Sequence, residues 1–129
     1  MLWPKPQPAL AVAKAILIDY PVLPATGILI TDPTSRPDKY VVLDLLPGSY
    51  PYPSFTEPRV MANCYAKTKT LASDLGDDVL TAFLNARGVF AGAWVKKFAE
   101  PRGPYELKNP DISDRFRFQV YGELRLSTR

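Results

Sequence analysis

The sequence predicts an α+β protein with a mixed, mostly antiparallel sheet and two helices packed on one face. Residues 59–66 alternate as a strand and run directly into a helical pattern that ends near Gly88. Residues 115–126 alternate between apolar and polar side chains as a second strand, and prolines separate the remaining short apolar runs. At 129 residues, the chain is expected to form a single domain, residues 1–129.

The N-terminal part is expected to hold one helix and two strands. Residues 1–8 are rich in proline and are expected to be extended. A helix over 8–20 follows, because apolar residues recur on one of its sides, and Pro21 ends it. The runs 28–31 and 39–46 are apolar or β-branched, as is typical of strands, and turn residues separate them.

Residues 47–58, PGSYPYPSFTEP, are predicted to be a loop without regular structure, because prolines recur throughout the segment. Tyr50, Tyr52 and Phe55 alternate with these prolines. Two interpretations stay open. The rings could cover the edge of the sheet, or the segment could dock on a partner and become ordered there.

The second helix is predicted from a Thr68 or Thr70 cap to about Ala86. Apolar residues recur at three- and four-residue spacing and should pack on the sheet: Leu71, Leu75, Val79, Ala82, Phe83 and Ala86. The strand before it places small side chains on one face, which suits close packing of a helix.

The C-terminal part is predicted to contain a strand at 89–98, an irregular segment at 100–113 and the long last strand. Along that last strand, one set of side chains should face the core: Phe116, Phe118, Val120, Leu124 and Leu126. The other set should face solvent or a partner: Arg115, Arg117, Gln119, Tyr121, Glu123 and Arg125.

The composition gives no indication of catalysis, a cofactor or a metal site. Histidine is absent, which removes the commonest general base and metal ligand. Cys64 is the single cysteine, has no histidine to activate it, and is expected to be a buried, inert thiol. No signal peptide or membrane span is predicted, so no membrane contact is expected and a reducing cytoplasm suits the chain.

The arginine-rich face of the last strand is the main candidate for contact with a partner. Arg115, Arg117 and Arg125 with Tyr121 are reminiscent of a platform for single-stranded nucleic acid. Against this, the face has one aromatic residue, Glu123 dilutes its charge, and the net charge is only +3. A subunit contact is favoured, with Tyr50, Tyr52 and Phe55 as further interface residues.

Several segments together resemble the tail terminator proteins of long-tailed bacteriophages. These are the strand-to-helix stretch RVMANCYAKTKTLASDLGDDVLTAFLNA, Gly103-Pro104, Asn109-Pro110-Asp111 and the closing strand led by Arg115. The resemblance covers most of the chain from about Val41. It implies a mixed sheet with helices on one side and assembly into a ring of six subunits.

In that family the ring caps the tail tube, ends its polymerisation and joins the tail to the neck of the head. The resemblance therefore implies a homohexamer, a tail tube protein and a neck or head-completion protein as partners, and genome DNA that passes through the lumen without sequence-specific binding. It also implies no catalysis, no cofactor, assembly in the host cytoplasm, and a final location in the tail or neck of the virion.

Three alternatives remain open. A head-completion or neck connector protein would share the fold and the ring but join the portal of the capsid. A small basic nucleic-acid-binding domain would use the arginine face and bind DNA with a steep salt dependence. An enzyme would need chemistry from scattered carboxylates, tyrosines and lysines that show no convergent spacing.

Overall fold

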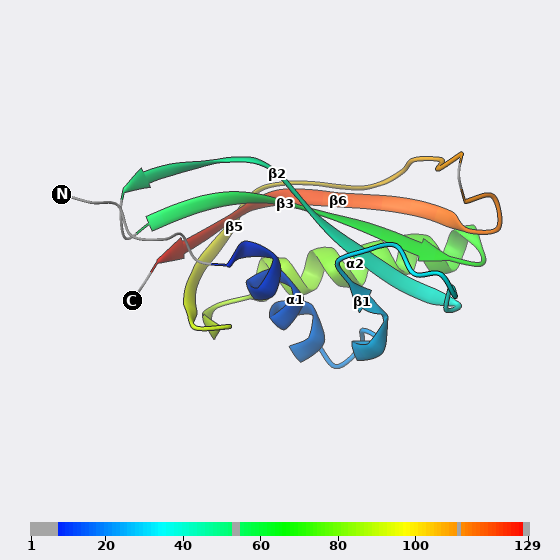
Figure 1. The fold of residues 1–129 in the computed structure, drawn as a ribbon, viewed down its shortest axis with the longest axis horizontal. Coiled ribbons are helices and arrows are strands. Elements are labelled where there is room, and N and C mark those ends of the chain that lie inside the picture. The colour runs from blue at the N-terminus through cyan, green and yellow to red at the C-terminus, as the bar shows by residue number, and fades with distance from the viewer. Residues whose placement is uncertain (1–7, 53–54, 111, 128–129) are drawn as a thin grey trace.

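The computed structural model describes residues 8–52, 55–110 and 112–127, and in these ranges two helices pack on a six-stranded sheet (Figure 1). The predicted fold class is confirmed. The elements, in chain order, are α1 (Ala9–Asp19), a 3-10 turn (Ala25–Gly27), β1 (Ile28–Leu29), β2 (Lys39–Tyr52), β3 (Phe55–Ala66), α2 (Lys69–Asn85), β4 (Gly88–Phe90), β5 (Ala93–Glu106) and β6 (Phe116–Ser127).

The strands lie in the order β1-β2-β3-β6-β5-β4. β1 is parallel to β2, and every other neighbouring pair is antiparallel. The register places Val41 opposite Cys64 and Ala62 opposite Val120, so their side chains share one face of the sheet. This helix face is defined by its buried residues: Val41, Leu43, Val60, Ala62, Cys64, Val120, Leu124 and Leu126.

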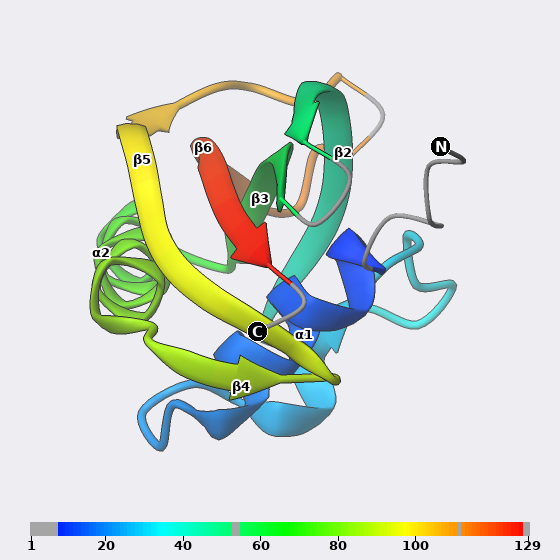
Figure 2. The same cartoon turned by 90° about the vertical axis from the view of Figure 1, so that its left-hand side faces the viewer.

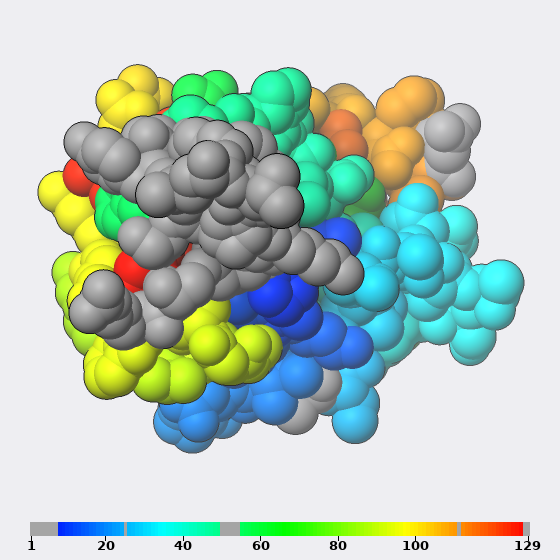
Figure 3. Space-filling model, turned by 60° about the vertical axis from the view of Figure 1, so that its left-hand side comes forward, coloured from blue at the N-terminus to red at the C-terminus, as the bar shows by residue number. Residues whose placement is uncertain are grey.

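Both helices bury their apolar sides against the helix face and form one continuous core with it (Figure 1). α1 contributes Val12, Ala13, Ile16 and Leu17, and α2 contributes Leu75, Val79, Ala82 and Phe83. Figure 3 shows α1 in dark blue between the yellow-green β4–β5 region and the cyan segment that precedes β2. The two helices therefore fill a single layer beneath the sheet.

α2 begins at Thr68, one of the two caps that the sequence allowed. The backbone N–H of Leu71 donates to Oγ1 of Thr68 over 3.2 Å, and Thr68 has the extended backbone of an N-cap residue. At the other end, the Arg87 guanidinium donates to the carbonyls of Leu84 and Ala86, which the last turn leaves without helical partners. These bonds fix where the helix starts and ends.

The segment 47–58 is not an irregular loop, so that prediction is wrong. β2 and β3 continue through it as a hairpin in which Tyr52 pairs with Phe55. Proline is tolerated because register shifts interrupt the ladder between Leu46 and Tyr52, and because β1 pairs with β2 only at Val41 and Val42. The expectation for residues 1–8 lies outside the described residues, except for Pro8 at the start of α1.

Two further boundaries differ from the prediction. Ala91 and Gly92 both have positive φ, which forms a two-residue turn and divides the predicted strand 89–98 into β4 and β5. β5 then continues to Glu106 through much of the predicted irregular segment. Its prolines fit because the ladder to β6 is bulged and because β4 covers only the first residues of its outer edge.

Two apolar residues were wrongly predicted to be buried. Leu71 is 43% exposed, because the buried stripe of α2 begins one residue later, at Ala72. Phe116 is 41% exposed, because it is the first residue of β6 and lies at the end of the sheet. The remaining predicted residues of both stripes are buried: Leu75, Val79, Ala82, Phe83, Ala86, Phe118, Val120, Leu124 and Leu126.

Replacement of Leu75 by alanine should destabilise the fold by about 2–5 kcal/mol, because the side chain is 2% exposed and its loss leaves a cavity in the core. Leu71→Ala is the matched control on the same helix and should cost less than about 0.5 kcal/mol. Urea unfolding of both variants measures the difference. Equal costs would show that the buried stripe is misassigned.

Gly122 makes room for an aromatic ring. A Cβ atom there would lie 2.5 Å from the Phe98 ring, which itself stacks on Phe83 with 4.8 Å between the ring centroids. Gly122→Ala should therefore destabilise the protein by about 1–3 kcal/mol through overpacking. In a double-mutant cycle measured by thermal unfolding, Phe98→Leu should recover part of this loss. Strict additivity of the two changes would contradict the steric account.

Candidate functional site

The sheet face opposite the helices carries Tyr121 and Arg125, two of the interface residues that sequence analysis selected. We call it the open face, defined by Arg59, Met61, Tyr121, Glu123 and Arg125. These side chains are half-buried, whereas their immediate neighbours along each strand are buried in the core. No helix of the described ranges packs on this face (Figure 1).

One end of the open face is covered by the segment that joins β5 to β6 (Figure 2). Beneath it, the rings of Tyr40 and Tyr65 stack at 4.8 Å, and Ile112 packs against them. Nδ2 of Asn109 donates to the Tyr65 hydroxyl over 3.1 Å. Burial raises the pKa of Tyr40 above its usual range, and its hydroxyl has no hydrogen-bond partner among the described residues. This end therefore has a small core of its own.

Two ion pairs lie on the uncovered part of the open face. Nε of Arg125 lies 2.7 Å from Oε2 of Glu57, and Nη2 of Arg59 lies 3.7 Å from Oε2 of Glu123. Arg102 is exposed and has no ion pair with any described residue. A hollow of about 130 Å³ separates these charges, lined by Arg59, Glu100, Arg102, Tyr121, Gly122 and Glu123.

Two of the predicted interface arginines serve the fold itself. The Arg115 side chain is only 7% exposed, and its guanidinium donates to the carbonyls of Arg36 and Pro37. Arg117 donates from Nε to the Leu107 carbonyl over 2.9 Å and from Nη2 to the Lys108 carbonyl over 3.2 Å. Both arginines therefore hold backbone segments that have no regular partner strand.

The predicted interface residues do not form one cluster. Arg117 lies at the start of β6, whereas Arg125 lies near its end, beside the β2–β3 hairpin (Figure 1). Phe55 is half-buried and pairs with Ser127 in the β3–β6 register. Tyr50 and Tyr52 belong to β2, and their side chains lie outside the described part of the structure. The structure thus brings Phe55 near Arg125 but not near Arg117.

A row of polar residues across three strands was not identified from the sequence. The Tyr105 hydroxyl donates to Oε1 of Gln119, and Nε2 of Gln119 donates to Oδ1 of Asn63 over 3.0 Å. Tyr105 also meets the Tyr121 ring edge-to-face at 6.3 Å, and burial raises its pKa. The prediction that Gln119 faces solvent or a partner is wrong, because Gln119 is only 8% exposed and both polar atoms of its side-chain amide bond within the chain. Alternation placed it on the correct face of β6, but its partners depend on the register.

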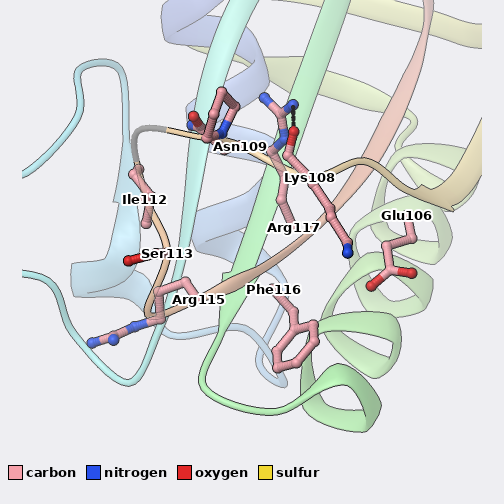
Figure 4. Close-up of a pocket in the computed structure, with 9 residues that line it drawn as sticks. Glu106, Lys108, Asn109, Ile112, Ser113, Arg115, Phe116 and Arg117 are labelled. Carbon is pink, nitrogen blue, oxygen red and sulfur yellow. Dashed lines mark hydrogen bonds between the residues drawn. The ribbon is translucent and has the colours of Figure 1, made fainter.

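A cavity of about 440 Å³, which we call the loop pocket, lies between the β5–β6 connection and the start of β6. Among the described residues, Lys108, Arg115 and Arg117 line it as cations, and Glu106 lines it as a carboxylate. Asn109, Pro110, Ile112, Ser113 and Phe116 complete the wall. In Figure 4, Lys108 extends toward the end of β5 that carries Glu106, whereas Arg115 points the other way.

The described residues contain no group of three or more cysteine, aspartate or glutamate side chains placed to hold a metal ion. Cys64 is fully buried on the helix face, as predicted, and burial raises the pKa of its thiol far above the usual range. Within the described ranges, no helix has both the length and the apolar character needed to cross a membrane. Neither a known protein-family model nor a curated protein sequence matches the chain.

Cys64 should be unreactive in the native protein, because only the thiolate reacts and both burial and the raised pKa suppress it. With a chromogenic disulfide reagent at pH 8, we expect the native protein to release no measurable chromophore over minutes. In denaturant, one thiol per chain should react fully. Fast reaction of the native protein would show that the core opens around β3.

Proposed function

We propose that this chain is a phage assembly protein, a tail terminator that forms a ring, caps the tail tube, ends its polymerisation and joins the tail to the neck. The observation that carries the proposal is the two-layer fold, in which both helices cover one sheet face and leave the open face to a neighbour. That fold agrees with the one implied by the resemblance of residues 59–86 and the segments after them.

The chemistry of the open face suits contact between identical subunits. Its charges alternate in sign, and most are already paired within the chain, so a neighbouring subunit meets a fixed charge pattern. Such a pattern sets register and orientation more than affinity. A contact between two different surfaces of identical subunits closes into a ring when the rotation allows it, as a homohexamer requires.

The β2–β3 hairpin is the second proposed contact. It carries Tyr50, Tyr52 and Phe55 at one end of the sheet, and aromatic residues are enriched in the cores of interfaces. We propose that this end of the β2–β3 ladder contacts the tail tube protein or the next subunit. This replaces the idea of a loop that becomes ordered on docking.

The alternatives fit the described contacts less well. A nucleic-acid platform needs free cations, but Arg125 and Arg59 pair with glutamates, and Arg117 is bound to backbone carbonyls. Passage of DNA through a lumen needs no such platform. A neck or head-completion protein would use the same surfaces, and the partner that binds the ring distinguishes it from a terminator. We propose no enzymatic activity.

Arg102→Glu should weaken ring assembly about tenfold or more, because it places a third carboxylate beside Glu100 and Glu123 on the open face. Since Arg102 is exposed and has no described ion pair, the monomer should stay folded. Negative-stain images and light scattering of the purified protein measure assembly, and circular dichroism checks the fold.

Lys14→Glu is the matched control, because it makes the same change of charge on α1, in the helix layer. It should leave assembly unchanged. Rings that form equally well with Arg102→Glu would place the subunit contact elsewhere. A parent protein that stays monomeric, both alone and with the tail tube protein, would contradict the ring itself.

A further inference from the structure

We propose that the acidic outer side of α2 in one copy of this chain binds a row of cations on β5 of the next copy. The inference rests on the proposed function, because it names the two surfaces through which the ring would close. The occupant of the open face is then a helix of a second copy, in the way that α2 of the same chain already covers the helix face.

The cationic row lies on the open face along β5 and consists of Lys96, Lys97 and Arg102. In the β5–β6 register, Lys97 pairs with Arg125 and Arg102 pairs with Tyr121, and both partners belong to the open face. All three cations are exposed, and none has an ion pair with a described residue. The row is therefore available to carboxylates of another chain.

An exposed apolar pair lies at one end of the cationic row. Trp94 is 42% exposed and pairs with Val89 of β4, which is 55% exposed. Nζ of Lys96 lies 5.5 Å from the centre of the Trp94 ring, so the ammonium and the ring share one side of β5. Aromatic residues are enriched in the cores of interfaces, and charged residues lie around them. Trp94 and Val89 thus supply apolar contact area next to the charges.

The outer side of α2, defined by Asp74, Asp77 and Leu84, carries the complementary charge. At 100° per residue, these positions lie opposite the buried stripe, and all three side chains are exposed. Neither aspartate has an ion pair within the described ranges. Lys69 pairs with Glu106, and the rest of α2 contains no lysine or arginine. The helix therefore presents negative charge that its own chain leaves uncompensated.

The two surfaces match in length and in direction. α2 has 17 residues and is about 25 Å long. β5 from Trp94 to Arg102 spans roughly 26 Å, so a helix laid along it reaches every cation of the row. The outer side of α2 and the open face point away from the sheet in opposite directions (Figure 1). Copies would therefore meet head to tail, and such a contact closes into a ring when the rotation allows it.

A second copy suits the cationic row better than nucleic acid does. Contact between copies pairs the cations of β5 and the aspartates of α2 at the same time, which sets the register of the two subunits. Nucleic acid would use the cations alone and leave the aspartates unpaired. The electrostatic pattern of the whole chain therefore favours contact between identical subunits.

The test is an exchange of charge between the two surfaces. Lys96→Glu with Lys97→Glu should weaken ring assembly about tenfold or more, and so should Asp74→Lys with Asp77→Lys, because like charges then face each other. An equimolar mixture of the two variants should form rings again, because opposite charges meet at every contact of an alternating ring. Mass photometry measures the rings. All four side chains are exposed, so circular dichroism and unfolding midpoints should match the parent.

Asp32→Lys with Asp44→Lys is the matched control for the α2 variant. Both aspartates are exposed, lie outside α2 and have no ion pair with a described residue. The control should assemble as the parent does. Its mixture with the Lys96→Glu and Lys97→Glu variant should not restore rings, because the acidic side of α2 is unchanged.

The inference and the proposed function both fail if the parent stays monomeric, alone and with the tail tube protein. The inference alone fails if the parent forms rings but the mixture of the two variants does not, or if the control restores rings equally well. It also fails if the Lys96→Glu and Lys97→Glu variant forms normal rings. Loss of binding to the tail tube protein or to DNA in those rings would then assign the cationic row to that partner.

Discussion

The close packing of α2 against the middle of the sheet is the contact on which the rest of the structure depends. β3 is a central strand, and its helix face carries only small or medium side chains, namely Val60, Ala62, Cys64 and Ala66. This lets the helix approach β3 and leaves room for the Phe83 and Phe98 rings beside it. α1 fills the remaining space under β2, so both helices are buried against the same face of the sheet. The other side must be polar, because nothing is left to cover it.

That constraint explains how the arginines of β6 are used. Many cations on one uncovered sheet face would repel one another. In this chain, the arginines instead pair with glutamates or donate hydrogen bonds to backbone carbonyls. Arg125 and Arg59 face glutamates on neighbouring strands. Arg115 and Arg117 hold the segments before β2 and after β5, where strand pairing is absent. The same residue type therefore supplies both the charge pattern of the open face and the attachment of its loops.

The sequence was sufficient for the parts of the fold that depend on local periodicity. The helix stripe from Leu75 to Ala86 and the alternation of β6 follow from spacing alone. For the cap of α2, the sequence left Thr68 and Thr70 open, and the structure has Thr68. Strand length was underestimated at residues 47–58 and 100–106. A proline lacks a backbone N–H, and this disrupts a strand only where a neighbouring strand would accept a hydrogen bond at that position. Which edges are free depends on strand order, and that is set by contacts far apart in the chain.

The candidate sites show the same division. The arginines and tyrosines of β6 could be selected from alternation, but their partners could not, because Glu57, Leu107 and Pro37 reach them only through the sheet register and the return of a loop. The loop pocket likewise depends on where the chain leaves β5 and re-enters β6. Phe116 was wrongly predicted to be buried for a related reason. Alternation identifies the face on which a side chain lies, but not where the helix that covers this face ends.

The prolines and bulges on β2 and β5 have a consequence for how the protein can associate. Beyond Val42 and Val95, the outer edges of these strands have no partner strand within the described ranges, and such edges are templates for fibrous aggregation. Here Pro47, Pro101 and Pro104 interrupt them, and Lys96 adds charge. These features disfavour open-ended growth of the sheet from chain to chain. The ring that we propose would therefore use contacts on the face of the sheet, which can be limited in number.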